Sequence, residues 1–300
     1  MRPLKALTPE QQQSFLDNGY LVVKNCLDTD VVQRWVAEGY ERLGYDPKDP
    51  STWAEEIIWM KYKNEMPIRD LAPRAWDTIL DMVGGEDRLE TRSFTNKEDQ
   101  YPMSSFNWSD GFIANFRRGA DRPWQPPSPE AGGWHKDGGS ITHFLDSPEQ
   151  ALLTVVLWTD MRHRGGATFI SPDSVRPVAR CLAEHPEGFT PTGFDFPALL
   201  SQCSRFEELT GSAGDVVILH PYILHASSQN VLGVPRLITN PPVMLKDPMN
   251  FNRPNPADFS PLERATLHYL DVDHLDFKPT SPRTVNWWVN APDPNGLLDP

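Results

Sequence analysis

The sequence lacks any run of about eighteen apolar residues, so no part of it is expected to cross a membrane as a helix. The first residues, Met1 to Lys5, also lack the apolar stretch of a secretion signal. Only three cysteines are present, Cys26, Cys181 and Cys203, without the paired spacing of a disulfide framework or a zinc motif. We therefore expect a cytoplasmic protein whose cysteines are ordinary buried residues.

Positive charge is also scarce. The chain of 300 residues has 28 Lys and Arg against 41 Asp and Glu, which gives a formal net charge of -13. This is the wrong sign for a protein whose affinity comes from neutralising phosphates, so we expect neither nucleic acid nor a membrane as a partner. No feature indicates an obligate protein partner, and we expect a small-molecule substrate.

Helical signals dominate the first part of the chain. Thr8 is a predicted N-cap, with proline at the first helical position and Gln11 three residues after the cap, which predicts a helix to about residue 17. Apolar residues recur at helical spacing from Val31 to Leu43, before Gly44, and a further helix is predicted over residues 72–83. Residues 1–95 are therefore expected to be mainly helical, with one short β-prone run at residues 19–23.

Short β-prone runs follow, separated by loops rich in Gly and Pro. There are 30 prolines, about twice the usual share of near 5%. Many short strands with such loops indicate a sandwich or jelly roll rather than βαβ units. We expect one domain over residues 1–300, with a core at about 105–245 and an extension at about 246–300. The β-prone runs cover residues 112–116, 152–158, 167–170, 216–219 and 237–239.

The pattern His-x-acid is the first candidate for a metal site. Two histidines and one carboxylate leave neighbouring coordination positions open, which suits iron(II). With 8 histidines and 41 acidic residues the pattern is expected about once by chance, and it occurs at His135, His185 and His274. No histidine follows His274, and a proline separates His185 from Glu187. Only His135, with Asp137 two residues later and glycines on both sides, remains as a candidate pair.

A third ligand must come from much later in the chain. His220 and His225 are five positions apart, so in a regular strand they face opposite ways and only one is expected to bind the metal. We choose His225, because Ser227 shares its face and Arg236 lies on the next β-prone segment. A guanidinium can hold a carboxylate with two hydrogen bonds, and a hydroxyl can add a third.

These motifs together resemble the phytanoyl-CoA dioxygenase family of iron(II)- and 2-oxoglutarate-dependent oxygenases. The resemblance covers residues 8–240 and includes residues 19–23, Trp134-His135-Lys136-Asp137, Gly165-Gly166-Ala167-Thr168, and His225-Ala226-Ser227 followed by Arg236. It implies a mainly β protein with a helical N-terminal part, namely a double-stranded β-helix (jelly-roll, cupin-like) barrel buttressed by helices. Val175 departs from the family pattern, since a His often stands at that position.

The resemblance also implies residue roles. His135, Asp137 and His225 would be the catalytic iron ligands, and Arg236 with Ser227 would anchor the co-substrate 2-oxoglutarate. Thr168 and Asn115 would line the same site. Near these motifs, four aromatic residues are candidates for the substrate pocket, although core packing is their commoner role: Phe112, Trp134, Phe144 and Trp158.

The expected activity is oxidation of an unactivated C–H bond of a small metabolite in secondary metabolism, by hydroxylation, desaturation or cyclisation, with release of succinate and CO2 and consumption of O2. Three alternatives stay open: a fatty acyl-CoA hydroxylase, a metalloenzyme that does not use 2-oxoglutarate, and a non-catalytic binding module on the same fold. For Trp287 and Trp288 we prefer plain terminal packing over a role at the barrel mouth.

Overall fold

The computed structural model describes residues 4–97 and 102–289, and all structural statements below concern these residues. The helices are α1 (Pro9–Asn18), α2 (Thr29–Leu43), α3 (Ile68–Leu71), α4 (Pro73–Val83), α5 (Val175–Glu184), α6 (Phe196–Leu200) and α7 (Pro261–Leu270). The strands are β1 (Tyr20–Val23), β2 (Ile57–Trp59), β3 (Glu65–Pro67), β4 (Phe94–Asn96), β5 (Pro102–Met103), β6 (Asn107–Ser109), β7 (Ile113–Asn115), β8 (Leu152–Leu157), β9 (Thr168–Ser171), β10 (Glu207–Leu209), β11 (Val216–Leu219), β12 (Leu224–Ser227), β13 (Arg236–Thr239), β14 (Pro242–Val243) and β15 (Trp287–Val289).

The three helices predicted near the N-terminus are confirmed. Thr8 and Gln11 form both bonds of a capping box on α1. Helix α2 ends at Gly44, whose φ of 68° is in the left-handed region that terminates helices. Helix α4 ends in the same way at Gly84. The prediction was incomplete beyond these helices, because α5 and α7 lie in the part of the chain where we expected strands and loops.

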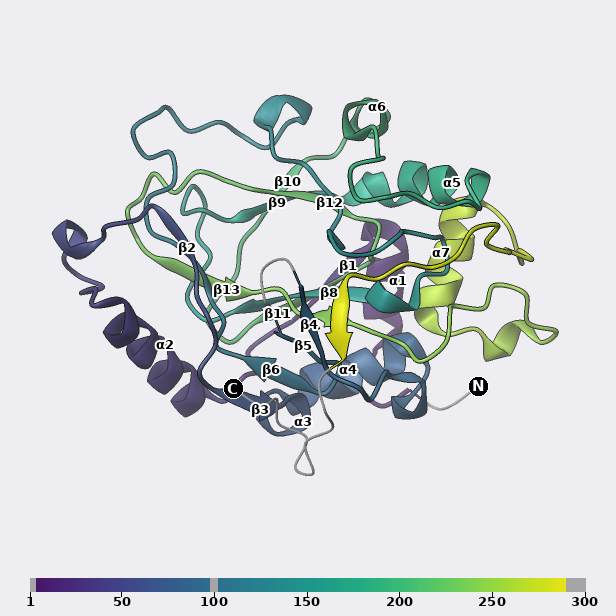
Figure 1. The fold of residues 1–300 in the computed structure, drawn as a ribbon, viewed down its shortest axis with the longest axis horizontal. Helices are drawn as coiled ribbons and strands as arrows, with labels where there is room; N and C mark the ends of the chain where they lie inside the picture. Colours follow the sequence, from purple (N-terminus) through teal and green to yellow (C-terminus); the bar gives the residue numbers. More distant parts are fainter. Residues whose placement is uncertain (1–3, 98–101, 290–300) are drawn as a thin grey trace.

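The β-prone runs also form strands, β7, β8, β9, β11 and β13, with ends shifted by at most one or two residues. The largest sheet has seven strands, in the order β1-β11-β8-β13-β7-β2 with β14 beside β8, and every pair in it is antiparallel. A second antiparallel sheet, β10-β9-β12, lies above it in Figure 1. Antiparallel sheets with helices are thus established, while strand pairing in the described residues does not by itself close a barrel.

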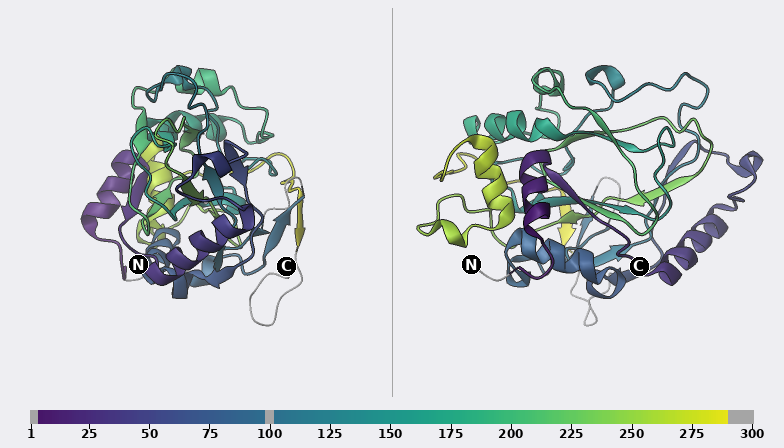
Figure 2. Two further views of the ribbon diagram at one scale, coloured as in Figure 1. Left: turned by 90° about the vertical axis from the view of Figure 1, so that its left-hand side faces the viewer. Right: turned by 180° about the vertical axis from the view of Figure 1, so that it is seen from behind.

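Helices cover the sheets at opposite ends of the molecule. α1, α5 and α7 lie together at one end and α2 at the other in Figures 1 and 2. Trp35 of α2 stacks on Trp158 just beyond β8, with ring centroids 5.1 Å apart, so α2 is fixed by aromatic packing. None of the helices in residues 4–97 and 102–289 is long and apolar enough to cross a membrane.

Candidate metal centre and its surroundings

His135 and His225 are neighbours across an isolated antiparallel bridge. The amide of His135 donates to the carbonyl of His225 at 2.9 Å, and the amide of His225 donates to that of His135 at 3.0 Å. Residues paired in this way carry their side chains on the same side of the ladder. The two imidazole centroids are accordingly 4.4 Å apart. His225 comes from β12, whereas His135 lies outside the named strands and forms only this single bridge.

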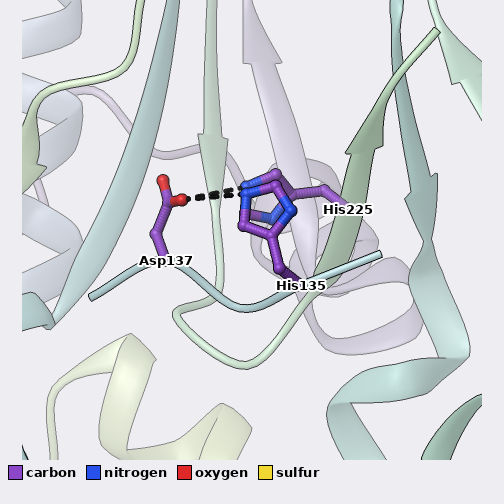
Figure 3. A group of neighbouring side chains, drawn as sticks. All are labelled: His135, Asp137 and His225. Atoms are coloured by element: carbon purple, nitrogen blue, oxygen red, sulfur yellow. Dashed lines mark ion pairs between the residues drawn. The ribbon is translucent and has the colours of Figure 1, made fainter. Parts of the chain in front are cut away.

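Asp137 faces both imidazoles (Figure 3). Its Oδ1 is 3.2 Å from Nε2 of His135 and 3.3 Å from Nε2 of His225. Each of the three residues offers one ligand atom, and these three atoms all lie within 4.8 Å of one another. Asp137 sits in a bend after the bridge, and Gly138 follows with φ of 113°, where a Cβ would be 2.5 Å from the ring of His143. This backbone requires glycine, which explains one of the flanking glycines.

The outer nitrogens of both imidazoles are held by backbone carbonyls. Nδ1 of His135 is 2.8 Å from the carbonyl oxygen of Gly133, and Nδ1 of His225 is 3.2 Å from that of Ile223. A carbonyl only accepts hydrogen bonds, so each Nδ1 carries a proton, and Nε2, which faces Asp137, is the nitrogen left to bind a metal. This second contact is usual for metal-binding histidines. The donor set of two imidazoles and one carboxylate therefore fits iron(II).

The roles of two polar residues close to Asp137, namely Asn240 and Lys136, were not predicted from the sequence. Asn240, just after β13, donates from Nδ2 to Oδ2 of Asp137 at 3.1 Å. Lys136 is buried and donates from Nζ to Oε1 of Gln150 at 3.1 Å, while His143 Nδ1 lies 2.9 Å from the same Nζ. Burial lowers the pKa of Lys136 to about 7. Its place inside the Trp-His-Lys-Asp motif was the available signal, but no pattern in the sequence marked Asn240.

The remaining histidines of interest lie outside this group. His220 is completely buried beside α7, where Nε2 is 3.1 Å from the hydroxyl of Thr266 and Nδ1 accepts from the amide of Tyr222 at 3.3 Å. Both of its ring nitrogens are thus engaged away from Asp137. His185 pairs with Glu187 on the surface at 2.7 Å.

Arg236 is buried, with 2% of its surface exposed, and pairs with Asn115 across β13 and β7. Its Nε donates to the carbonyl of Gly166 at 2.8 Å and its Nη1 to that of Ile113 at 3.3 Å. No carboxylate within residues 4–97 and 102–289 forms an ion pair with it. Burial, with a smaller effect of nearby Arg118, lowers the pKa of Arg236 to about 10. A buried guanidinium without a counter-charge is a site for an anion.

Ser227 and Thr168 are direct partners across β12 and β9, and Ser227 is two residues from His225. Strand alternation therefore places all three side chains on one face of this sheet. The Oγ of Ser227 is buried and has no hydrogen-bond partner in the described part of the chain. Asn115 is fully buried, and its amide donates to the carbonyl of Ser228 at 3.2 Å and accepts from the amide of Arg118 at 3.1 Å.

A cavity of about 220 Å³ opens beside Asp137. None of the four aromatic residues proposed for a pocket borders it. Phe112 and Trp158 pack on each other, and Trp134 packs on Phe206. Phe144 lies under the guanidinium of Arg283 at 4.8 Å. All four are buried core residues, because their strand and loop positions face neighbouring aromatic and apolar groups instead of this cavity.

Trp287 borders the cavity instead. It belongs to β15, which pairs with β4, and its ring centroid is 4.9 Å from that of Phe94. The preferred expectation of plain terminal packing was therefore incomplete, since the C-terminal segment reaches the same cavity as Asp137. The contact joins Trp287 to Phe94, 193 positions earlier in the sequence, and no local pattern indicates it.

Comparisons with known proteins give the family. The sequence pattern described as phytanoyl-CoA dioxygenase (PhyH) matches residues 15–237. A protein named ectoine dioxygenase, from Bordetella parapertussis, is 25% identical over 252 residues, which cover 77% of this chain and 73% of the relative. A protein of the same name from Bordetella bronchiseptica matches with the same identity and coverage.

The comparison with solved structures also gives two proteins that were solved with bound iron. The epimerase SnoN in complex with Fe3+, alpha-ketoglutarate and nogalamycin RO is 17% identical, with a TM-score of 0.46 and coverage of 78% of this chain and 82% of that one. EctD from S. alaskensis with bound Fe is 17% identical, with a TM-score of 0.45 and coverage of 83% and 82%. The family match over residues 15–237 carries the assignment. The chain belongs to the phytanoyl-CoA dioxygenase family and is a dioxygenase that uses iron(II), 2-oxoglutarate and oxygen.

Proposed function

We propose that His135, Asp137 and His225 hold the iron in this enzyme. The support is the convergence of two Nε2 atoms and one carboxylate oxygen, together with Nδ1 contacts that fix both tautomers. His220 is not part of the proposed set, because both of its ring nitrogens have other partners.

Arg236 and Ser227 are the proposed anchor for the distal carboxylate of 2-oxoglutarate. The uncompensated guanidinium and the unpartnered hydroxyl both offer donors to an anion. Arg118 adds positive charge on the same side of the site, in a cavity of about 490 Å³ that Ser227 also borders. Thr168, opposite Ser227, and Asn115, opposite Arg236, are proposed to line the co-substrate site.

With iron and 2-oxoglutarate bound, the centre would supply oxidation of an unactivated C–H bond by O2, coupled to oxidative decarboxylation of 2-oxoglutarate to succinate and CO2. The protein's own residues supply geometry. The backbone bridge fixes the two imidazoles, Asn240 orients the Asp137 carboxylate, and Arg236 sets the direction of the co-substrate. The cavity beside Asp137 receives the substrate carbon and limits access of water.

The proposed substrate is a small metabolite, oxidised by hydroxylation, desaturation or cyclisation in secondary metabolism. The cavity of about 220 Å³ suits a small molecule, and the names of the Bordetella relatives also specify a small molecule, ectoine. A long acyl-CoA ester fits this cavity less well. We further propose that the chain acts as one domain over residues 1–300, in which the two facing sheets form a jelly-roll barrel.

Anaerobic titration tests the residue roles. Wild-type protein should bind iron(II) and then develop a visible charge-transfer band when 2-oxoglutarate is added. Arg236→Gln should retain iron but bind 2-oxoglutarate about tenfold or more weakly, because a charged hydrogen-bond donor is lost. Arg162→Gln, at an exposed arginine paired with Asp160, is the matched control and should leave the band unchanged. Equal 2-oxoglutarate affinity in both variants would exclude Arg236 as the anchor.

A further inference from the structure

The cavity beside Asp137 has an unusual distribution of charge. It is bordered by Glu149 and by no lysine, arginine or histidine of the described residues. Asp137 is the other acidic residue at its wall, and its negative charge is directed at the two imidazoles. The carboxylate of Glu149 is therefore the charge left to face a molecule in the cavity.

Two buried polar atoms at this wall lack a partner. The Oε2 of Glu149 and the Oγ of Ser140 are both buried without a hydrogen bond in the described part of the chain. Ser140 is 8% exposed and borders the cavity, as Glu149 does. Native proteins rarely leave such atoms unsatisfied, because each costs about 1–3 kcal/mol. Their common position indicates that a ligand satisfies them.

No lysine or arginine of the described residues forms an ion pair with Glu149, although Arg283 is near enough to lower the pKa of this carboxyl. Arg283, the cation near it, donates from Nη2 to Asp146 at 2.5 Å and lies over the ring of Phe144. Lys136 donates to Gln150, Asp137 and His143 and not to Glu149. Burial raises the pKa of Glu149, and this unfavourable effect on the charged form is removed when a cation binds.

Aromatic rings complete the cavity. Trp59 of β2 and Trp287 of β15 both border it, and 66% of Trp59 is exposed. The face of a tryptophan ring attracts organic cations, with roughly 0.5–2 kcal/mol for each contact. An acidic side chain combined with tryptophan rings is the usual chemistry of a site for an organic cation.

The second cavity, which Ser227 borders, carries charge of the opposite sign. Arg118 and Arg122 border the second cavity together with Ser227. An anion is therefore favoured on the Ser227 side, and a cation on the Glu149 side. Such a division keeps the dianionic co-substrate out of the substrate cavity and orients both molecules about the metal.

We propose that the cavity beside Asp137 binds a small organic cation, an amine, amidine or quaternary ammonium compound, with Glu149 as its counter-charge, Ser140 as a hydrogen-bonding partner and Trp59 and Trp287 as aromatic walls. The inference rests on the proposed function, because it assigns the substrate class of the same site.

Choline and 3,3-dimethylbutan-1-ol are suitable probes, because they have the same shape and differ in charge. Their binding to the full-length protein, loaded anaerobically with iron(II) and 2-oxoglutarate, can be measured by calorimetry. Choline should bind about tenfold or more tightly than the neutral alcohol, as expected for a contribution near 1.4 kcal/mol from the carboxylate and the rings. Equal affinity, tighter binding of the alcohol, or no binding of choline would overturn the proposal.

Variants locate the effect. Glu149→Gln should reduce the choline preference to about twofold or less, whereas Glu184→Gln, at an exposed residue at the end of α5, removes the same charge elsewhere and should retain it. Ser140→Ala leaves the charge in place and should weaken both probes without changing their ratio. A preference that persists in Glu149→Gln would overturn the role of Glu149.

The charge-transfer band distinguishes failure of the proposed substrate class from failure of the proposed function. A protein that forms the band but shows no choline preference contradicts only the substrate class. Loss of the band itself contradicts the proposed function.

Discussion

Asn240 donates a hydrogen bond to Oδ2 of Asp137, the oxygen that does not face the imidazoles. Oδ1 is left free to approach the position between His135 and His225. The Asn240 amide follows β13, the strand that also carries Arg236. Strand β13 therefore carries the proposed co-substrate anchor, and the residue that directly follows it contacts a proposed metal ligand.

Removal of this contact should weaken iron binding. Asn240→Ala leaves the Asp137 carboxylate free to rotate, and loss of such an outer partner typically costs about 10–100-fold in metal affinity. Iron(II) titration under anaerobic conditions measures the change. The exposed Asn252→Ala variant serves as a control and should bind iron as the wild type does. Unchanged affinity in Asn240→Ala would show that the hydrogen bond does not orient the ligand.

The choice between the two neighbouring histidines is tested by a pair of variants. His225→Ala should lower the affinity for iron by more than the roughly 10–100-fold expected when an outer partner is removed, because here a ligand itself is removed. His220→Ala should retain iron affinity, although it leaves a cavity and removes the hydrogen bond to Thr266 and so lowers the free energy of unfolding. Metal content and thermal unfolding measured on both variants distinguish these effects. Loss of iron only in His220→Ala would reverse the assignment.

Ser227 gives a test that separates binding from stability. Because its buried Oγ has no partner in the described structure, Ser227→Ala removes no protein hydrogen bond and should leave the free energy of unfolding unchanged or slightly increased. The affinity for 2-oxoglutarate should fall severalfold, since a hydrogen bond to a charged group is lost. Denaturant unfolding without 2-oxoglutarate and titration with it provide the two values. Marked destabilisation without any change in 2-oxoglutarate affinity would indicate a structural hydroxyl.

Local patterns were sufficient for much of the fold. The capping box at Thr8 and Gln11, and the glycine after α2, depend only on nearby residues, and both elements form as expected. The proposed metal group was also accessible, because the glycine-flanked His-x-acid pattern and the later histidine each have a sequence signal. Helices α5 and α7 were not predicted. Each has a proline in its first turn, Pro177 and Pro261, where a helix tolerates proline.

The substrate side could not be predicted in the same way. Its walls come from β2, β7, the segment after Asp137 and β15, which meet only through tertiary pairing. Phe112 and Trp158 lie close to the motifs in sequence, yet they pack against α2 and each other. Proximity along the chain does not indicate which aromatic residues border this cavity, since strand direction and alternation decide which side chains face it.

His220 makes stability depend on pH in a defined direction. Burial, with a smaller effect of Lys136, lowers the pKa of His220 from 6.5 to about 3. Between these values the unfolded chain binds a proton that the folded protein does not, so the free energy of unfolding falls as the pH decreases through this window. The contribution is about 1.4 kcal/mol per pH unit, and it vanishes above about pH 6.5.

His220→Gln should remove this contribution. Denaturant unfolding of the metal-free protein at several values from about pH 6.5 to pH 4 should show a slope smaller than that of the wild type by about 1.4 kcal/mol per pH unit, whatever the variant's absolute stability. The exposed His274→Gln variant is the matched control and should leave the slope of the wild type unchanged, because its side chain is in solvent in the folded and the unfolded state. Parallel curves for wild type and His220→Gln would mean that His220 is protonated in the folded protein, in conflict with its two hydrogen bonds to Thr266 and the amide of Tyr222.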